Sequence, residues 1–229
     1  MLYLYMAKKV YVQIGTNDGN DLFRSKVLKD RPDLVILVEP NAALKPLIEK
    51  NYKGIPNVHI YNKAVHYTND ATVELYIPAK NAVYGTTADN NITYSHQHFS
   101  LFPMNNWGSK NDMVKISAQT VTFDELCRLH TISQIHYLQI DTEGFDSEII
   151  KMIDFTKYQI QQLRFEIWNF EAASFTQHHT TEVASTLGIN GLHAAIQKLQ
   201  QHKYTLTKIH DRDGNDVLAT LTPTGSRAS

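Results

Sequence analysis

The chain has 229 residues, and its 22 Lys and Arg residues nearly balance 23 Asp and Glu residues, which gives a formal net charge of −1 at pH 7. Because this length suits one α/β domain with a substantial core, we expect a single domain over residues 1–221 and a disordered tail over residues 222–229. No run of Lys or Arg dominates any segment, which argues against nucleic acid as a partner. We also expect no membrane span, since no apolar run has the necessary length.

The single cysteine, Cys127, cannot form an internal disulfide. It falls in a predicted helix, where a buried, inert thiol is favoured over a nucleophile. The apolar start of the chain, residues 1–6, is too short for the core of a signal peptide and lacks a leading positive charge. We therefore expect a reducing, cytoplasmic location.

The first predicted element is a buried strand at residues 10–14, an alternating run of apolar, β-branched residues that ends at Gly15. Gly15 and Gly19 bracket three small polar residues, so backbone amides can approach a ligand without obstruction from side chains. A helix that begins near Asn20 would point its positive end at the same place. This glycine loop is the predicted ligand site.

A second apolar run at residues 34–38 predicts a central parallel strand, and it ends in Glu39 about twenty residues after the loop. In nucleotide-binding βαβ units, an acid at this spacing accepts hydrogen bonds from the hydroxyls of a ribose. The glycines do not follow the pattern G-x-G-x-x-G, and no lysine follows them as in a P-loop. A sulfonium nucleoside without phosphates therefore fits better than a dinucleotide or a nucleoside triphosphate.

Periodicity predicts the other strands at 57–61, 71–77, 113–121, 135–140 and 162–168, and a hairpin of 204–209 with 217–221. The same pattern predicts helices at 21–29, 42–51, 122–129 and 192–201, and one after Gly144. Asn41 caps the second of these helices, and Thr122 and Glu125 form a capping box that opens the third. The pair 71–77 and 113–121 alternates polar and apolar residues, as an added antiparallel pair does. The whole pattern predicts an α/β fold, a mainly parallel sheet with helices on both faces and a terminal antiparallel hairpin.

Acids follow the strand predicted at 135–140. Asp141 stands at its carboxyl end, the edge where ligands bind in such sheets, and we predict a functional role for it. Glu143 either shares that role or only favours the dipole of the following helix. Together with Glu166 and Asn169 at the next strand end, Asp141 could hold a magnesium ion, or these groups could simply bind the hydroxyls of a polyol.

Histidines supply further candidates for proton transfer. His96 and His98 lie in the irregular segment 81–112, whose aromatic residues either wall a substrate pocket or pin a surface flap without chemistry. The pair 178–179 is a reserve base, and a metal pair at 95–98 is disfavoured because no further ligand stands nearby. We expect His66 to be a structural residue.

Three segments, Ile14–Gly19, Val38–Asn41 and Gln139–Gly144, resemble in order and spacing the motifs of FkbM-type S-adenosylmethionine-dependent methyltransferases. The resemblance implies a Rossmann-like class I methyltransferase fold with a seven-stranded sheet. It also implies a set of residues that bind S-adenosylmethionine: Gln13, Gly15, Thr16, Asn17, Asp18 and Gly19 around its methionine part, Glu39 at the ribose, Asn62 and Ala64 at the adenine, and Asp141.

The chain departs from the family pattern at three positions. Gln13 stands where the family usually has an aspartate, Gln139 replaces a lysine, and Asp146 replaces a later glutamate. The departure at Gln13 keeps open a binding module that retains the nucleoside pocket without catalysis. A nicotinamide-dependent oxidoreductase is the other alternative, although Asp18 would repel its pyrophosphate.

The family resemblance implies O-methylation, and family acceptors include sugar hydroxyls of glycans and hydroxyls of secondary metabolites. Methyl transfer is an in-line displacement, so the enzyme must align the reactants and remove the acceptor's proton. Asp141 is the first candidate for the base, followed by Glu166, His96 and His98. A sugar, with a deoxysugar favoured, suits a pocket edged by aromatics, acids and amides, and the domain would then work beside glycosyltransferases.

Overall fold

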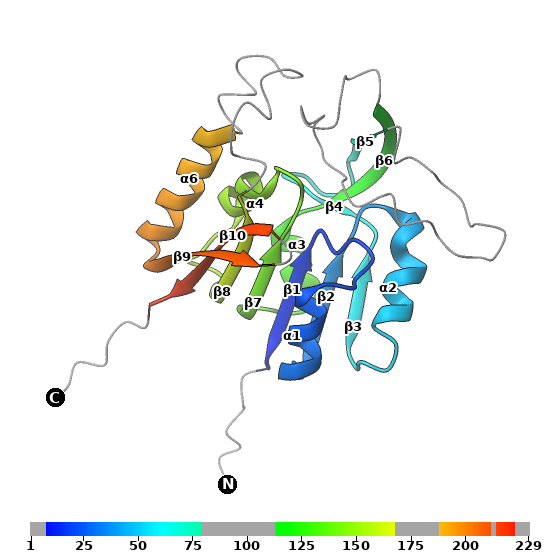
Figure 1. Cartoon of the computed structure of the whole chain (residues 1–229), viewed down its shortest axis with the longest axis horizontal. Coiled ribbons are helices and arrows are strands. Elements are labelled where there is room, and N and C mark those ends of the chain that lie inside the picture. Colours follow the sequence, from blue (N-terminus) through cyan, green and yellow to red (C-terminus); the bar gives the residue numbers. More distant parts are fainter. Residues whose placement is uncertain (1–7, 79–112, 168–187, 212–213, 223–229) are drawn as a thin grey trace, which may run out of the picture.

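A computed structural model describes residues 8–78, 113–167, 188–211 and 214–222 of the chain. Figure 1 shows its elements in sequence order. The strands are β1 (Val10–Ile14), β2 (Leu34–Val38), β3 (Val58–Tyr61), β4 (Ala64–Val65), β5 (Thr72–Pro78), β6 (Met113–Val121), β7 (Gln134–Ile140), β8 (Gln159–Glu166), β9 (Tyr204–Asp211) and β10 (Gly214–Leu221). The helices are α1 (Leu22–Asp30), the 3-10 helix η1 (Ala42–Leu44), α2 (Lys45–Asn51), α3 (Phe123–Leu129), α4 (Asp146–Met152) and α6 (Gly188–Gln201).

The main sheet has seven strands in the order β3-β2-β1-β7-β8-β10-β9. Neighbouring strands from β3 to β8 are parallel, whereas β10 runs antiparallel to both β8 and β9. The order reverses at β1, where the chain goes outward to β2 and β3 and later returns to pair β7 on the other side. The prediction of a mainly parallel sheet with a terminal antiparallel hairpin is confirmed, and ligands in such sheets bind where the order reverses.

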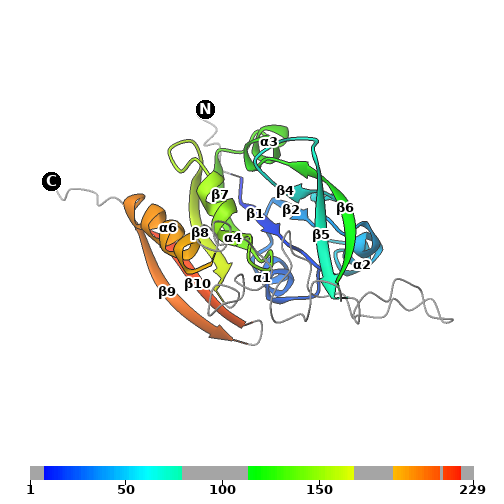
Figure 2. The same cartoon turned by 90° about the horizontal axis from the view of Figure 1, so that it is seen from above.

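Helices cover both faces of this sheet, as Figure 2 shows. Apolar side chains of α1, η1 and α2 pack on one face, and those of α3, α4 and α6 pack on the other. Cys127 of α3 is buried in the second layer, and burial raises the pKa of its thiol to about 12. The thiol therefore stays protonated and serves packing, as predicted. No helix in the described part of the chain is long and apolar enough to cross a membrane.

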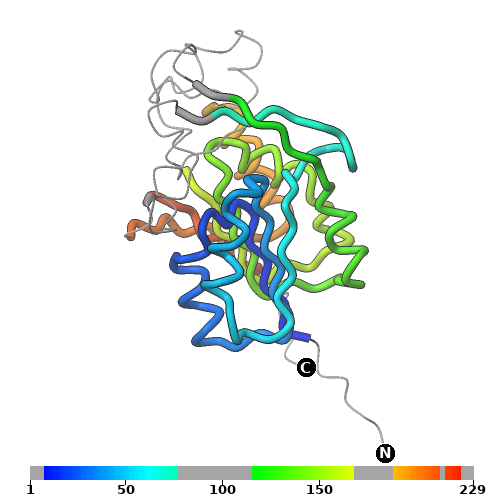
Figure 3. The backbone as a smooth tube through the Cα atoms, turned by 90° about the vertical axis from the view of Figure 1, so that its right-hand side faces the viewer, coloured from blue at the N-terminus to red at the C-terminus, as the bar shows by residue number. Residues whose placement is uncertain are grey.

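A second, three-stranded sheet has the order β4-β6-β5, and Figure 3 shows it beyond one end of the main sheet. Strands β5 and β6 pair antiparallel, from Thr72 opposite Gln119 to Pro78 opposite Met113, which confirms the predicted antiparallel pair. The short strand β4 joins them by pairing parallel to β6. This third strand was not predicted, because two residues are too few to show a period.

Several boundaries differ from the prediction. Strand β8 begins at Gln159 instead of residue 162, because its polar first residues pair with β7 from Gln134 onward. The helix predicted at 42–51 divides into η1 and α2, with Pro46 in the first turn of α2. The capping box is half formed. The hydroxyl of Thr122 accepts from the amide of Glu125, but the Glu125 carboxylate pairs with Arg128 instead of returning to residue 122.

The other two differences lie near the end of the chain. Helix α6 begins at residue 188 instead of 192. The paired strands of the hairpin extend to Asp211 and begin again at Gly214, beyond the predicted bounds of 204–209 and 217–221. Both elements were drawn too short because polar residues at their ends hid the continuation of the pattern.

Candidate active site

A pocket lies at the carboxyl ends of β1, β2 and β7, below strands β4 and β5 of the second sheet. It encloses about 640 Å³, part of which is open to solvent. Its walls are formed by Ile14, Gly15, Asn17, Val38, Glu39, Pro40, Lys63, Ala64, Val65, Leu75, Asp141, Thr142, Glu143 and Phe145.

The glycine loop is held inside the fold by its own backbone. The amides of Gly15 and Thr16 both donate to the carbonyl of Val38, at 2.9 and 3.2 Å, and the amide of Gly19 donates to the carbonyl of Thr16. Gly15 has a φ of +83°, and a Cβ atom on it would lie 1.7 Å from the carbonyl oxygen of Asp141. Glycine is therefore required here by the neighbouring strand. Protein acceptors take the amides of Gly15, Thr16 and Gly19, and the role of the loop in binding a ligand stays a prediction.

Glu39 connects two loops at the end of β2. One carboxylate oxygen accepts from the amide of Asn17, and the other accepts from the amide of Asn41, both at 2.8 Å. The side chain is buried yet faces the pocket. Burial raises the pKa of Glu39 to about 7, against the opposing effect of the two amide hydrogen bonds. A carboxylate has about four lone-pair sites, so each oxygen retains capacity for a ligand hydroxyl.

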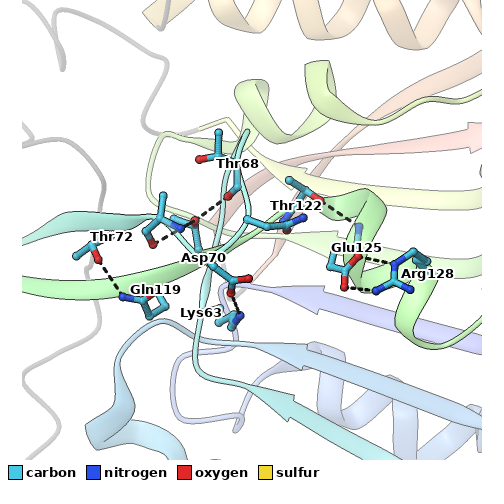
Figure 4. A network of polar contacts seen from close by, with 11 residues as sticks. Lys63, Thr68, Asp70, Thr72, Gln119, Thr122, Glu125 and Arg128 are labelled. Carbon is cyan, nitrogen blue, oxygen red and sulfur yellow. Dashed lines mark hydrogen bonds and ion pairs between the residues drawn. The ribbon is translucent and has the colours of Figure 1, made fainter.

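Lys63 is the only basic residue among those that line the pocket in the described ranges. Its ammonium group lies 2.6 Å from the carboxylate of Asp70, and Figure 4 shows this pair beside the contacts that fix the second sheet. Within those contacts, the buried hydroxyl of Thr120 donates to the carbonyl of Thr68 at 2.7 Å and accepts from the amide of Ala71. The turn between β4 and β5 is thereby fixed on β6, which places Lys63 and the strands above the pocket.

Carboxyl groups gather at the ends of β7 and β8. The amide of Asp141 donates to the carbonyl of Ile14, so this residue lies beside the end of β1, and both Asp141 and Glu143 line the pocket. Burial, and then the negative charges of Glu143 and Asp146, raise the pKa of Asp141 well above its usual range. Burial and the charges of Glu143 and Asp141 also raise the pKa of Glu166. Mutual repulsion therefore makes this edge receptive to a proton or a cation.

The sequence of residues 13–214 matches the Methyltransferase FkbM domain. The chain belongs to the FkbM methyltransferase family. A comparison with curated proteins found no significant match.

Several solved structures are similar to this FkbM domain at low sequence identity. An O-methyltransferase from Bacillus cereus, in complex with S-adenosylhomocysteine, has 9% identity and a TM-score of 0.48, with 94% of this chain and 74% of that chain covered. The fibrillarin pre-rRNA processing protein of Methanococcus jannaschii has 6% identity and a TM-score of 0.46, with coverage of 96% and 70%. Precorrin-6y C5,15-methyltransferase from Geobacter metallireducens has 11% identity and a TM-score of 0.43, with coverage of 96% and 84%.

The residues predicted to bind the cofactor divide into two groups in the FkbM fold. Those that line the pocket are Gly15, Asn17, Glu39, Ala64 and Asp141. The others are not among its lining residues in the described ranges and make contacts within the protein. The side-chain amide of Asn62 donates to the carbonyl of Glu39 at 3.2 Å, the hydroxyl of Thr16 lies 3.4 Å from the carbonyl of Val38, and Asp18 accepts from the amide of Asn20. A Cβ atom on Gly19 would lie 3.0 Å from the ring of Tyr52.

Gln13 occupies the position where the FkbM family usually has an aspartate. Its side chain is fully buried on the face of the sheet that α1 covers, and it donates from Nε2 to the carboxylate of Asp21. Asp21 also caps α1 by accepting from the amide of Arg24. The Oε1 atom of Gln13 has no hydrogen-bond partner among the described residues. A negative charge is thus present beside position 13, but Asp21 supplies it.

Some predicted residues lie outside the described residues: His96, His98, Asn169 and the histidines at 178 and 179, with the aromatic residues of segment 81–112. Their roles as bases, ligands or pocket walls stay predictions. Within the described ranges, no group of three or more His, Cys, Asp or Glu side chains is arranged to hold a metal ion. The magnesium hypothesis also stays a prediction, since its third ligand, Asn169, is not described.

Several residues of the pocket were not predicted from the sequence. Lys63, Leu75 and Phe145 line it. Leu75 belongs to a strand with a recognisable alternation, but nothing in that pattern shows that the strand folds over the edge of another sheet. Lys63 immediately precedes Ala64, and its position next to a predicted adenine contact was the available signal.

Proposed function

We propose that this FkbM domain transfers a methyl group from S-adenosylmethionine to a sugar hydroxyl, in a glycan or a deoxysugar. The observation that carries the proposal is the charge distribution of the pocket. Glu39, Asp141 and Glu143 line it in the described ranges, whereas its one lysine is already paired with Asp70. Such a site favours a cationic sulfonium nucleoside and opposes a pyrophosphate, so a nicotinamide dinucleotide fits poorly.

We propose a set of contacting residues for each part of S-adenosylmethionine. Glu39 accepts hydrogen bonds from the ribose hydroxyls with the lone pairs that Asn17 and Asn41 leave unused. Pro40 and Ala64, which line the same pocket, offer apolar contact to the adenine ring. The carboxyl groups of Asp141 and Glu143 would then hold the positively charged methionine part.

S-adenosylmethionine supplies an electrophilic methyl group on a positively charged sulfur. The carboxylate of Asp141 removes the proton of the acceptor hydroxyl as the new carbon–oxygen bond forms and the carbon–sulfur bond breaks. The positive charge of the donor favours the ionised form of Asp141, and the raised pKa of this group makes its carboxylate a stronger base than an exposed aspartate. Neutralisation of the sulfonium and protonation of the carboxyl occur in the same step, so the total charge of the site is unchanged.

Sugar acceptors fit the acidic edge because carboxylates accept hydrogen bonds from several hydroxyls at once. Glu143 and Asp141 present such acceptors toward the pocket, and Phe145 and Leu75 add apolar surface for a ring face. An O-methylated product also agrees with the family resemblance drawn from the sequence.

The test is a turnover assay with a panel of sugars, deoxysugars and glycans, in which formation of S-adenosylhomocysteine is measured with and without magnesium. Asp141→Asn should lower kcat by about 10²–10⁴, the usual contribution of a general base, and lower the affinity for S-adenosylhomocysteine much less. Asp124→Asn, an exposed substitution on α3, is the matched control and should retain full activity.

Two results would contradict the proposal. If wild-type protein binds the cofactor but methylates no acceptor, the domain is a binding module. If it binds NADH and not S-adenosylmethionine, the pocket belongs to a different class of enzyme.

A further inference from the structure

Asp146, the first residue of α4, joins the ends of two neighbouring strands. Its side chain is fully buried. One carboxylate oxygen accepts from the amide of Thr142 at 3.2 Å and from the hydroxyl of the same residue at 2.8 Å. The other oxygen accepts from the amide of Glu166, the last residue of β8, at 3.3 Å. A single carboxylate therefore holds the loop after β7 against the end of β8.

This connection lies directly behind the acidic edge of the pocket. Thr142 stands between Asp141 and Glu143 in the sequence, and all three residues line the pocket. Asp146 is not among the lining residues in the described ranges, so it reaches the pocket only through its neighbours.

The loop that Asp146 holds is strained in two ways. Glu143 and Gly144 both have positive φ values, 53° and 100°, and the first of these is costly for a residue with a Cβ atom. Asp141, Glu143 and Glu166 also repel one another. A loop under such strain keeps its shape only where the surrounding contacts fix it.

A buried carboxylate without a direct role would be a poor choice for packing. Burial raises the pKa of Asp146 to about 6, while the hydrogen bonds from Thr142 and Glu166 partly oppose that rise. The group is therefore ionised in neutral buffer, at the cost of desolvation. The three hydrogen bonds that it accepts offset this cost, because bonds to a charged group are stronger than neutral ones.

We propose that Asp146 is a positioning residue of the methyl-transfer site, which fixes the loop after β7 so that Asp141 and Glu143 present their carboxyl groups to the sulfonium of the donor. This inference rests on the proposed function. It assigns to position 146, where the family resemblance expects a glutamate, a task that does not require contact with the cofactor.

The proposal makes a specific prediction about two ligands that differ by one methyl group and one charge. S-adenosylmethionine carries the sulfonium, whereas S-adenosylhomocysteine is neutral at sulfur. Acids fixed against the pocket favour the charged ligand, so the ratio of the two affinities reports their placement. A residue with a merely structural role would change both affinities alike and leave the ratio unchanged.

The experiment is calorimetric titration of both ligands at pH 8 into four variants of the full chain. Asp146→Asn replaces one acceptor oxygen by a donor, and Thr142→Val removes the hydroxyl contact without a change of charge. Asp146→Glu restores a carboxylate. Asp154→Asn is the matched control, because Asp154 accepts from the amide and hydroxyl of Thr156 in the same manner but is exposed, just after the other end of α4.

Asp146→Asn should lower the preference for S-adenosylmethionine over S-adenosylhomocysteine roughly fivefold, an effect of the size expected for a charge displaced near a protein surface. Thr142→Val should lower it in the same direction but less. Asp146→Glu should recover part of the preference, and Asp154→Asn should keep all of it.

An unchanged ratio in folded Asp146→Asn and Thr142→Val would overturn the inference, as would a ratio that falls equally in Asp154→Asn. Circular dichroism of each variant establishes that it is folded. Failure of wild-type protein to bind either ligand would instead refute the proposed function, so the two failures are distinguishable.

Discussion

The segments that follow β2 and β7 are each held by a buried carboxylate that accepts hydrogen bonds from two separate segments of backbone. Glu39 joins the glycine loop to the start of η1, and Asp146 joins the β7–α4 loop to the end of β8. Burial raises the pKa of both groups, to about 7 and about 6. They differ in position, because Glu39 lines the pocket and Asp146 stands behind its wall.

That difference separates binding from positioning. A carboxylate that lines the pocket can accept hydrogen bonds from ligand hydroxyls with its remaining lone pairs. A carboxylate behind the pocket wall affects a ligand only through the residues that it holds. Gly15 lies between the two regions, since its amide contacts the end of β2 and its Cα approaches the end of β7. Substitutions at these places should therefore have different signatures.

The largest effect is expected at the junction itself. Gly15→Ala places a Cβ atom 1.7 Å from the carbonyl oxygen of Asp141, so β1 and β7 must separate. We expect a loss of about 3 kcal/mol or more in the free energy of unfolding, measured by urea denaturation. Gly54→Ala is the matched control. It has a similar φ of +84° with nothing within 4 Å, and should cost only about 1–2 kcal/mol of backbone strain. Equal losses would show that the close approach of the two strands is unimportant.

The next effect is a pH dependence of ligand affinity, which we expect from Glu39 in the pocket wall. Since the pKa of Glu39 is about 7, its carboxylate is ionised above that pH and gains a proton below it. The proton occupies an acceptor site, so affinity for S-adenosylhomocysteine should fall by up to about tenfold between pH 8 and pH 6. Glu39→Gln should bind weakly at both pH values, whereas Asp146→Asn should retain the fall. A pH-independent affinity in wild-type protein would contradict the role of Glu39.

The smallest effect, on the free energy of unfolding, is expected in the second sheet. There the neutral hydroxyl of Thr120, and not a carboxylate, joins separate segments of backbone. Thr120→Val removes the contacts to Thr68 and Ala71 and should lower the free energy of unfolding by about 1–2 kcal/mol. Asp70→Asn breaks only the exposed pair with Lys63 and should cost less than about 1 kcal/mol. A larger loss for Asp70→Asn would mean that the ion pair, and not the buried hydroxyl, fixes this sheet.

Much of the fold could be predicted from local patterns of residues in the sequence. The apolar runs of β1 and β2, the caps at Asn41 and Thr122, and the final hairpin all appear close to their predicted places. These features depend on neighbouring residues in the chain. The ends of β8 and α6 were less predictable, because polar residues there are included by pairing and packing with distant elements.

The sequence predicted the acidic residues of the site but not the hydrogen bonds that join its segments. Glu39 and Asp141 mark strand ends, and both line the pocket. The amides of the glycine loop seemed available from sequence, yet the carbonyl of Val38 takes two of them. Asp146 was noted only as a departure from the family pattern. Its three hydrogen bonds reach residues 4 and 20 positions away, and no periodicity records such contacts.

The most direct test of the account is calorimetric titration of S-adenosylhomocysteine into wild-type protein, Glu39→Ala and Glu49→Ala. Glu49 lies exposed on α2 and is the matched control. We predict micromolar binding that Glu49→Ala retains and that Glu39→Ala weakens by about 1.5–3 kcal/mol, the value of hydrogen bonds to a charged group. Equal affinity in Glu39→Ala, or no binding by folded wild-type protein, would contradict the account.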